Sequence, residues 1–151
     1  METDQLSVNL PGYLRPYHIK SLVRVGKDYD GGYVIDERSI AKSEILLSFG
    51  VSDDWSFEKD FLERQKVLLF AFDGSISRKF FIKSFIKFLP RIYKLKALAG
   101  KLFKVRDYGR FFRNDKVHIQ KFVGMDRAPF HVSVPTILDT ILPSDADNIF
   151  L

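Results

Sequence analysis

The sequence predicts an α/β fold in which helices flank a mainly parallel sheet. Three consecutive segments lead to this prediction: an apolar run at 45–49, apolar residues at helical spacing over 56–65, and a second apolar run at 67–72. Continuous apolar runs are typical of strands that are buried on both faces of a sheet, and a helix between two such strands is typical of parallel pairing. These segments therefore predict one unit of strand, helix and strand.

The residues before this unit predict short, irregular elements. Prolines and glycines are frequent here, and they favour turns over long helices or strands. The predicted segments are a loop or short helical entry around 11–16, an apolar stretch at 22–25, a turn at 28–33, a short strand at 33–35 and a turn or short helix at 37–42.

The stretch 43–73 is the most informative part of the chain. Gly50 follows the first strand, where a residue without Cβ can turn sharply and lie against a ligand, and Asp53, Asp54 and Ser56 can cap the helix that follows. The second strand ends at Asp73, and an acidic residue at that place can accept both hydroxyls of a ribose. The pattern predicts a ribonucleoside ligand, with an ordinary strand-to-helix turn as the alternative. The turn lacks GxGxxG, which disfavours NAD and FAD.

The remaining segments continue the alternation of helices and strands. Pro135 suits the first turn of a helix. The predicted elements are an amphipathic helix at 78–89 ended by Pro90, short helical pieces at 91–114 interrupted at Gly100 and Gly109, a third strand at 117–123 ended by Gly124, a loop at 129–134, a helix at 136–142 and the start of a fourth strand at 149–151. Because a strand of three residues is an unusual end for a domain, we expect the sheet to be incomplete at the C-terminus.

Positive charge is concentrated in residues 77–114. This segment holds 12 of the 24 Lys and Arg residues, nine aromatic residues and a single acid, Asp107. Lys79, Lys83 and Lys87 lie opposite the apolar side of the predicted helix, an arrangement typical of helices that bind anionic membranes. The alternatives are a charged acceptor, a nucleic acid, for which no RNP-like or zinc-finger pattern is present, and a helix that packs its phenylalanines on the sheet.

Composition narrows the classes of function. A chain of 151 residues predicts one domain, and the lack of cysteine excludes disulfides, a thiolate nucleophile and Cys-ligated metals. The three histidines have no ligand spacing, and neither HExxH nor GxSxG occurs, so we expect neither a metal site nor a hydrolase. The lack of cysteine fits a reducing cytosol, and no apolar run approaches the length of a membrane span, so we expect a cytoplasmic protein that is soluble or peripheral to the membrane.

Three stretches together resemble the FkbM-type methyltransferases, which have the Rossmann-like class I S-adenosylmethionine-dependent fold. They are RVGKDYDGGYVI from Arg24, LLSFGVSDDWSFEKDF from Leu46 and FAFD from Phe70. The resemblance continues through KFVGMD at 121–126 and the VPTILDTIL segment, and it leaves out the basic segment. It therefore implies that 77–114 is a helical insertion after the second strand of a single methyltransferase-like domain.

The resemblance implies O-methyl transfer from S-adenosylmethionine to a small-molecule, glycan or lipid-linked acceptor. It assigns residues to four places: Ser48, Gly50, Val51 and Asp53 to the methionine moiety, Asp73 and Gly74 to the ribose, Gly124, Met125 and Asp126 to the adenine, and Arg24, Asp30 and Tyr33 to the cleft. In this family a Lys-x-Asp-x-Glu-Gly stretch follows the fourth strand, and the chain ends at Leu151, before that stretch. No catalytic base is therefore predicted.

Two other functions remain open from the sequence. A noncatalytic Rossmann-like module could attach to a membrane or a partner through the basic segment, and an oxidoreductase would need to bind a dinucleotide without the usual glycines. An incomplete sheet would also leave an exposed edge, which favours a homo-oligomer.

Overall fold

A computed structural model describes residues 11–14, 18–29, 31–88, 95–125, 129–140 and 148–151. Its centre is a parallel sheet of four strands, in the order β5–β4–β3–β8. The strands are β3 (Ile45–Phe49), β4 (Leu68–Phe72), β5 (Lys116–Ile119) and β8 (Ile149–Phe150). In chain order this is a 3-2-1-4 arrangement, which doubly wound sheets share, so the predicted α/β class is confirmed and the fold is compatible with a Rossmann-like one.

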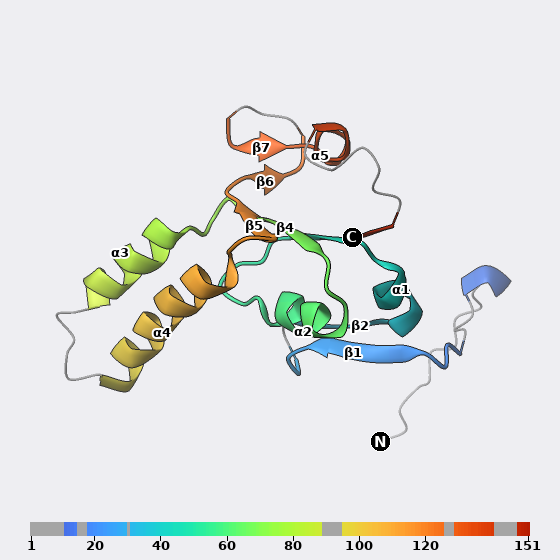
Figure 1. Ribbon diagram of the computed structural model, residues 1–151, viewed down its shortest axis with the longest axis horizontal. Coiled ribbons are helices and arrows are strands. Elements are labelled where there is room, and N and C mark those ends of the chain that lie inside the picture. Colours follow the sequence, from blue (N-terminus) through green and yellow to red (C-terminus); the bar gives the residue numbers. More distant parts are fainter. Residues whose placement is uncertain (1–10, 15–17, 30, 89–94, 126–128, 141–147) are drawn as a thin grey trace, which may run out of the picture.

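A separate hairpin covers the central helix on its outer side. β1 (Leu22–Gly26) pairs antiparallel with β2 (Gly32–Asp36), and α2 (Ser56–Arg64) lies between this hairpin and the sheet (Figure 1). The backbone N–H of Gly26 donates to the Asp60 carboxylate at 2.8 Å, which ties the hairpin to α2. The pattern had predicted the short strand and the turn, and both are present.

Short capping contacts set the helix starts on this side of the sheet. α1 (Glu37–Lys42) begins after Asp36, whose carboxylate accepts a hydrogen bond from the Arg38 N–H. The Asp54 carboxylate accepts one from the Ser56 N–H at 3.1 Å, so it serves the first turn of α2 as predicted. A short 3-10 helix, η1 (Gly12–Leu14), lies near the start of the chain.

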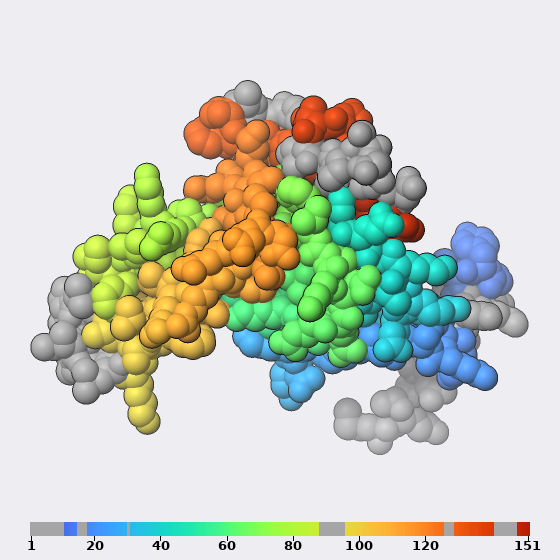
Figure 2. Space-filling model, in the orientation of Figure 1, coloured from blue at the N-terminus to red at the C-terminus, as the bar shows by residue number. Residues whose placement is uncertain are grey.

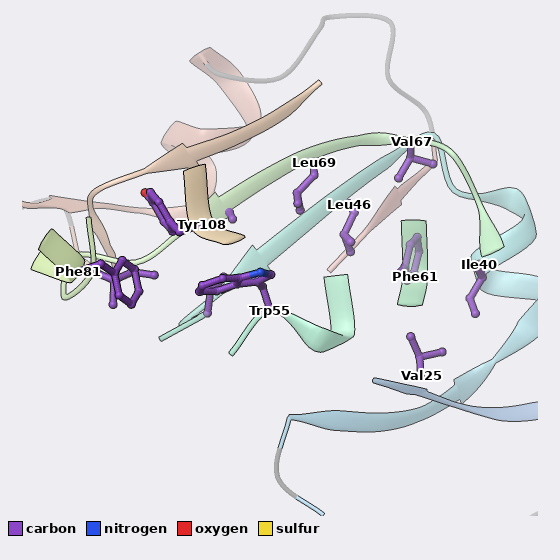
Figure 3. Close-up of a cluster of buried hydrophobic side chains, with 12 residues drawn as sticks. Val25, Ile40, Leu46, Trp55, Phe61, Val67, Leu69, Phe81 and Tyr108 are labelled. Atoms are coloured by element: carbon purple, nitrogen blue, oxygen red, sulfur yellow. The ribbon is translucent and has the colours of Figure 1, made fainter. Parts of the chain in front are cut away.

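The core occupies both faces of the sheet because alternate residues of each strand point to opposite sides. Leu46 and Leu69 belong to the cluster that includes Phe61 of α2 (Figure 3). Leu47 and Phe72 belong to a second cluster with residues from the elements that follow β5. The sheet is thus covered on both faces, as expected for parallel strands.

The basic segment forms two long helices that pack against each other. α3 (Arg78–Phe88) and α4 (Leu95–Phe111) extend to one side of the sheet (Figure 1), and Figure 2 shows them as one end of the molecule. The predicted interruptions at Gly100 and Gly109 are wrong, because α4 runs through both. Glycine costs a helix about 1 kcal/mol relative to alanine, and packing of α4 on α3 and the core offsets that cost.

Side chains of this segment also complete the main core. Phe81 of α3 and Tyr108 of α4 are buried in the cluster around Trp55, whose ring centroid is 5.9 Å from each of theirs. Phe80 and Ile86 are exposed, so the phenylalanine side of α3 is only partly covered. The alternative in which this helix packs its phenylalanines on the sheet therefore holds for Phe81 and not for Phe80.

The region after β5 differs from the prediction. The expected strand at 117–123 is interrupted where the Lys121 N–H donates to the Ile119 carbonyl at 2.8 Å. The chain then leaves the main sheet and forms β6 (Phe122–Val123), which pairs in parallel with β7 (His131–Val132) inside the predicted loop. α5 (Val134–Thr140) follows, with Pro135 in its first turn as predicted. The predicted last residues of this helix, 141–142, lie outside the described residues. Pro90, the predicted end of α3, lies outside them too.

Candidate functional site

A cavity of about 510 Å³ opens at the carboxyl end of β3. Its described walls come from β2, the end of β3, the turn to α2, the first turn of α2 and the end of β8. They include Gly31, Tyr33, Val34 and Ile35; Leu47 through Asp54; Phe57 and Glu58; and Phe150 and Leu151. β3 and β8 are the first and fourth strands of the sheet in chain order, so the cavity lies where the strand order reverses. In open α/β sheets this crevice is the usual ligand site.

The turn between β3 and α2 has an unusual backbone conformation. Gly50 has φ +71° and Ser52 has φ +51°. Residues other than glycine rarely adopt positive φ. A Cβ atom built on Gly50 would meet nothing within 4 Å, so this part of the backbone is open to close approach by a ligand. The Gly50 N–H donates to the Phe72 carbonyl at 2.9 Å, which fixes the turn against β4.

Asp73 stabilises this turn from the neighbouring strand end. Its Oδ2 accepts a hydrogen bond from the Ser52 N–H at 2.7 Å, and its Oδ1 accepts one from the Ser75 N–H at 2.7 Å. Partial burial opposes ionisation, but the hydrogen bonds from Ser75 and Ser52 hold the pKa of Asp73 below its usual value. The buried carboxylate therefore joins the turns after β3 and β4, and it is not part of the cavity wall.

Glu58 is a site residue that the sequence analysis missed. It lies on α2, is only 4% exposed, and accepts a hydrogen bond from the Ser48 hydroxyl through Oε1. Its Oε2 is buried and has no hydrogen-bond partner among the described residues. Burial raises the pKa of this carboxyl, and the negative charge of Asp54 adds to that effect. The signal in the sequence was its spacing, since Glu58 shares a helix face with the buried Phe61 three positions later.

The electrostatic character of the larger cavity is acidic. Asp53, Asp54 and Glu58 line it, and its described wall includes no Lys, Arg or His. Asp54 forms an ion pair with Lys27 at 3.0 Å. Partial burial alone would raise the pKa of Asp54, but hydrogen bonds from Lys27 and Ser56 hold that pKa below its usual value. The cavity therefore favours a ligand that carries positive charge.

Five predicted site residues meet in this cavity, and others lie elsewhere. Those in its wall are Ser48, Gly50, Val51, Asp53 and Tyr33. Arg24 instead donates to the carbonyls of Lys27 and Tyr29 and so braces the β1–β2 turn. Gly74 lies against the Phe122 ring, and Gly124 and Met125 follow β6, away from the described cavity wall. Asp30 and Asp126 lie outside the described residues. Lys79, Lys83 and Lys87 are exposed on α3.

A second cavity of about 260 Å³ adjoins the first through the same turn. Ser52 and Asp53 line both cavities, and Lys101 and Lys104 of α4 contribute positive charge to the second. The Lys104 ammonium donates to the Asp53 carbonyl and lies 5.0 Å from the centroid of the Trp55 ring. The basic segment thus reaches the candidate site directly.

A histidine links the basic segment to the end of β4. The Tyr108 hydroxyl lies 2.5 Å from His118 Nδ1, and His118 Nε2 lies 3.2 Å from the Asp73 carbonyl oxygen. Because a carbonyl only accepts, Nε2 is the donor, and the neutral ring then accepts from Tyr108 through Nδ1. Burial lowers the pKa of His118, which agrees with a neutral ring. This contact positions Asp73 and is not open to either cavity.

Comparisons with known proteins gave no match, whether the chain was compared with models of protein families, with curated proteins or with solved structures. In the part of the chain that the structure describes, no group of three His, Asp or Glu side chains is placed to hold a metal ion. Within the same residues, no helix combines the length and the apolar character that crossing a bilayer requires.

Proposed function

We propose that this chain belongs to an S-adenosylmethionine-dependent methyltransferase of FkbM type, which transfers a methyl group to an oxygen of a small-molecule, glycan or lipid-linked acceptor. The observation that supports this best is the acidic cavity at the point where the strand order reverses. Its position is that of a nucleoside site in a doubly wound sheet, and its wall includes the glycine turn and Tyr33, which the resemblance assigned to ligand contacts.

The charge of the cavity favours this cofactor over a dinucleotide. S-adenosylmethionine carries a sulfonium and an ammonium group, whereas NAD and FAD carry an anionic pyrophosphate. A pyrophosphate is normally bound at a helix N-terminus, and here the Asp54 carboxylate already accepts a hydrogen bond from the Ser56 N–H of the first turn of α2. Asp53 and Asp54 would repel a phosphate at this place. Positive charge on the ligand is the better match.

The residues present fit such a cofactor. The open backbone at Gly50 would let its methionine end lie against the turn, and Tyr33 would cover it from the hairpin. When bound, S-adenosylmethionine supplies an electrophilic methyl group. Asp73 would act mainly by holding the turn in place, because each oxygen of its carboxylate already accepts a hydrogen bond from a loop N–H. Placing the acceptor oxygen and excluding water would then supply much of the rate.

Calorimetric titration with S-adenosylhomocysteine tests the proposal. We expect binding in the micromolar range, about −8 kcal/mol, and no comparable binding of NADH. Tyr33→Ala should weaken the binding, since Tyr33 lines the cavity, whereas Tyr29→Ala serves as a control in the same hairpin because that side chain is 96% exposed and is not part of the wall. A folded sample that binds NADH and not S-adenosylhomocysteine would replace the proposal with an oxidoreductase.

A second candidate function is a binding module that attaches to an anionic membrane through α3 and α4. Exposed apolar side chains favour it: Phe80 is 47% exposed, Ile86 56% and Phe103 65%. They lie on helices that also expose Lys79, Lys83 and Lys87. Apolar residues that enter the interface beside lysines that attract anionic lipids are typical of peripheral membrane helices.

Cosedimentation with vesicles tests this second function. We expect binding to vesicles that contain phosphatidylglycerol and little binding to pure phosphatidylcholine. Replacing Lys79, Lys83 and Lys87 with glutamine should weaken it, because each lysine near the surface contributes about 1 kcal/mol. The matched control replaces Lys20, Lys42 and Lys66, which are also exposed. Equal losses in the two triple variants would contradict a site on α3.

A further inference from the structure

The buried carboxylate of Glu58 lies at the wall of the larger cavity without a complete set of partners. Ser48 of β3 donates to Oε1, and Oε2 has no partner among the described residues although it is shielded from water. A buried acceptor without a donor costs about 1–3 kcal/mol, and more when it is charged. Native proteins usually satisfy such groups, so this oxygen points to a donor that the described residues do not supply.

The surroundings define the chemistry of that donor. Among the described residues, Lys27 pairs with Asp54 but no cationic side chain pairs with Glu58 or lines the cavity, so a cationic donor on the ligand would neutralise the charge of the Glu58 carboxylate. The last torsion of a glutamate side chain is soft, so a small rotation can turn either oxygen toward the cavity. A primary ammonium group suits the place, since it is compact and offers three donors to one carboxylate and nearby hydroxyls.

We propose that the Glu58 carboxylate accepts hydrogen bonds from the ammonium group at the amino-acid end of the ligand. The Ser48 hydroxyl holds the Glu58 carboxylate in place. This inference rests on the proposed function, because it identifies the ammonium as that of the methionine moiety. Glu58 is then a specificity-determining residue: it selects adenosyl ligands that carry an amine over those that lack one. The bond is charge-assisted and shielded from water, which makes such pairs stronger than neutral hydrogen bonds.

Three adenosyl compounds separate the ammonium from the rest of the ligand. S-adenosylhomocysteine carries the ammonium and a carboxylate, its decarboxylated analogue keeps only the ammonium, and 5′-methylthioadenosine lacks both. We expect the wild-type chain to bind each of the first two at least about tenfold more tightly than 5′-methylthioadenosine. This comparison needs no substitution, so it holds even if a variant fails to fold.

Glu58→Gln then tests the residue. Affinity for the decarboxylated analogue should fall about tenfold, and affinity for 5′-methylthioadenosine should stay within about twofold of wild type. Glu63→Gln is the matched control on the same helix, since Glu63 is exposed and is not part of the cavity wall. Circular dichroism and thermal unfolding establish that both variants are folded.

The outcomes distinguish this inference from the proposed function. If all three compounds bind the wild-type chain equally, the ammonium site is wrong and the proposed function stands. If the preference for amines survives in Glu58→Gln, another group receives the ammonium and the assignment to Glu58 is overturned. If a folded sample binds none of the three, both the proposed function and the inference that rests on it fail.

Discussion

The Asp107 carboxylate in α4 accepts a hydrogen bond at 2.9 Å from the indole Nε1 of Trp55, which lies 52 residues earlier in the chain. Trp55 is buried, and Asp107 also accepts from the Lys59 ammonium at 2.7 Å. The single acid of the basic segment thus joins that segment to the start of α2 and to the turn beside the cavity.

Asp107→Ala should lower the free energy of unfolding by about 1–3 kcal/mol, because it leaves the buried Trp55 N–H without an acceptor. Asp107→Asn should cost less, since an amide oxygen can still accept from Trp55 and only the half-exposed ion pair with Lys59 is lost, worth about 1 kcal/mol or less. Urea unfolding measures both. Asp115→Asn, at an exposed position, is the control, and equal losses in the two Asp107 variants would contradict the role of the Trp55 bond.

Asp73→Ala should affect stability and binding together. The carboxylate holds Ser52 in its left-handed conformation and also accepts from Ser75, so its loss should cost about 1–3 kcal/mol of stability. On the proposed function it should also weaken S-adenosylhomocysteine binding about tenfold, or 1.4 kcal/mol. Ser75→Ala removes one donor and leaves the Ser52 bond, so its affinity should match wild type. A Ser75→Ala variant that binds as poorly as Asp73→Ala would show that the affinity depends on the turn after β4 and not on the Asp73–Ser52 bond.

Glu58 should make stability fall with rising pH. Burial raises its folded-state pKa above the ordinary value of 4.5, so the folded state holds the proton more tightly than the unfolded state. This contribution is fully present below pH 4.5 and is lost as pH rises through the folded pKa. Glu58→Gln removes the titration, and its melting temperature relative to wild type should therefore increase with pH. Thermal unfolding at several pH values measures this, and a pH-independent difference between the two proteins would refute it. Glu63→Gln should follow wild type at every pH.

Gly100→Ala should stabilise the protein by about 0.5–1 kcal/mol, because alanine loses less chain entropy in a helix. A Cβ atom at Gly100 would meet nothing within 4 Å, so the added methyl group causes no clash. Gly50→Ala should do the opposite, although its Cβ also has open space, since φ +71° strains any residue with a side chain. Thermal unfolding compares the two, and a Gly100→Ala variant that melts below wild type would be contrary to this account.

The central unit could be predicted because its signals are local. Each apolar run of β3 and β4 forms a strand, Asp54 accepts a hydrogen bond from the first residue of α2 and Gly50 turns the chain, all within thirty residues of sequence. The same stretch contains four of the five predicted site residues that line the cavity, namely Ser48, Gly50, Val51 and Asp53. Tyr33 was named through the resemblance, and it also lines the cavity.

The sequence-based predictions fail where contacts between distant parts of the chain determine the structure. α4 continues through its glycines because Tyr108 packs into the core, and the strand after Asp115 divides because β6 pairs with β7. The spacing of apolar residues along the chain indicates neither contact. The roles of Asp73 and Glu58 were hidden for the same reason, since a carboxylate's hydrogen bonds depend on which backbone the fold brings beside it.

Ser52 and Asp53 form a wall that is common to both cavities: Asp54 and Glu58 also line the larger one, and Lys101 and Lys104 also line the smaller one. A ligand that shifts this wall from one side changes the shape of the other side. If binding in one cavity moves this wall, the two affinities are linked, and such linkage is reciprocal: whatever one ligand does to the affinity of the second, the second does to the first by the same factor.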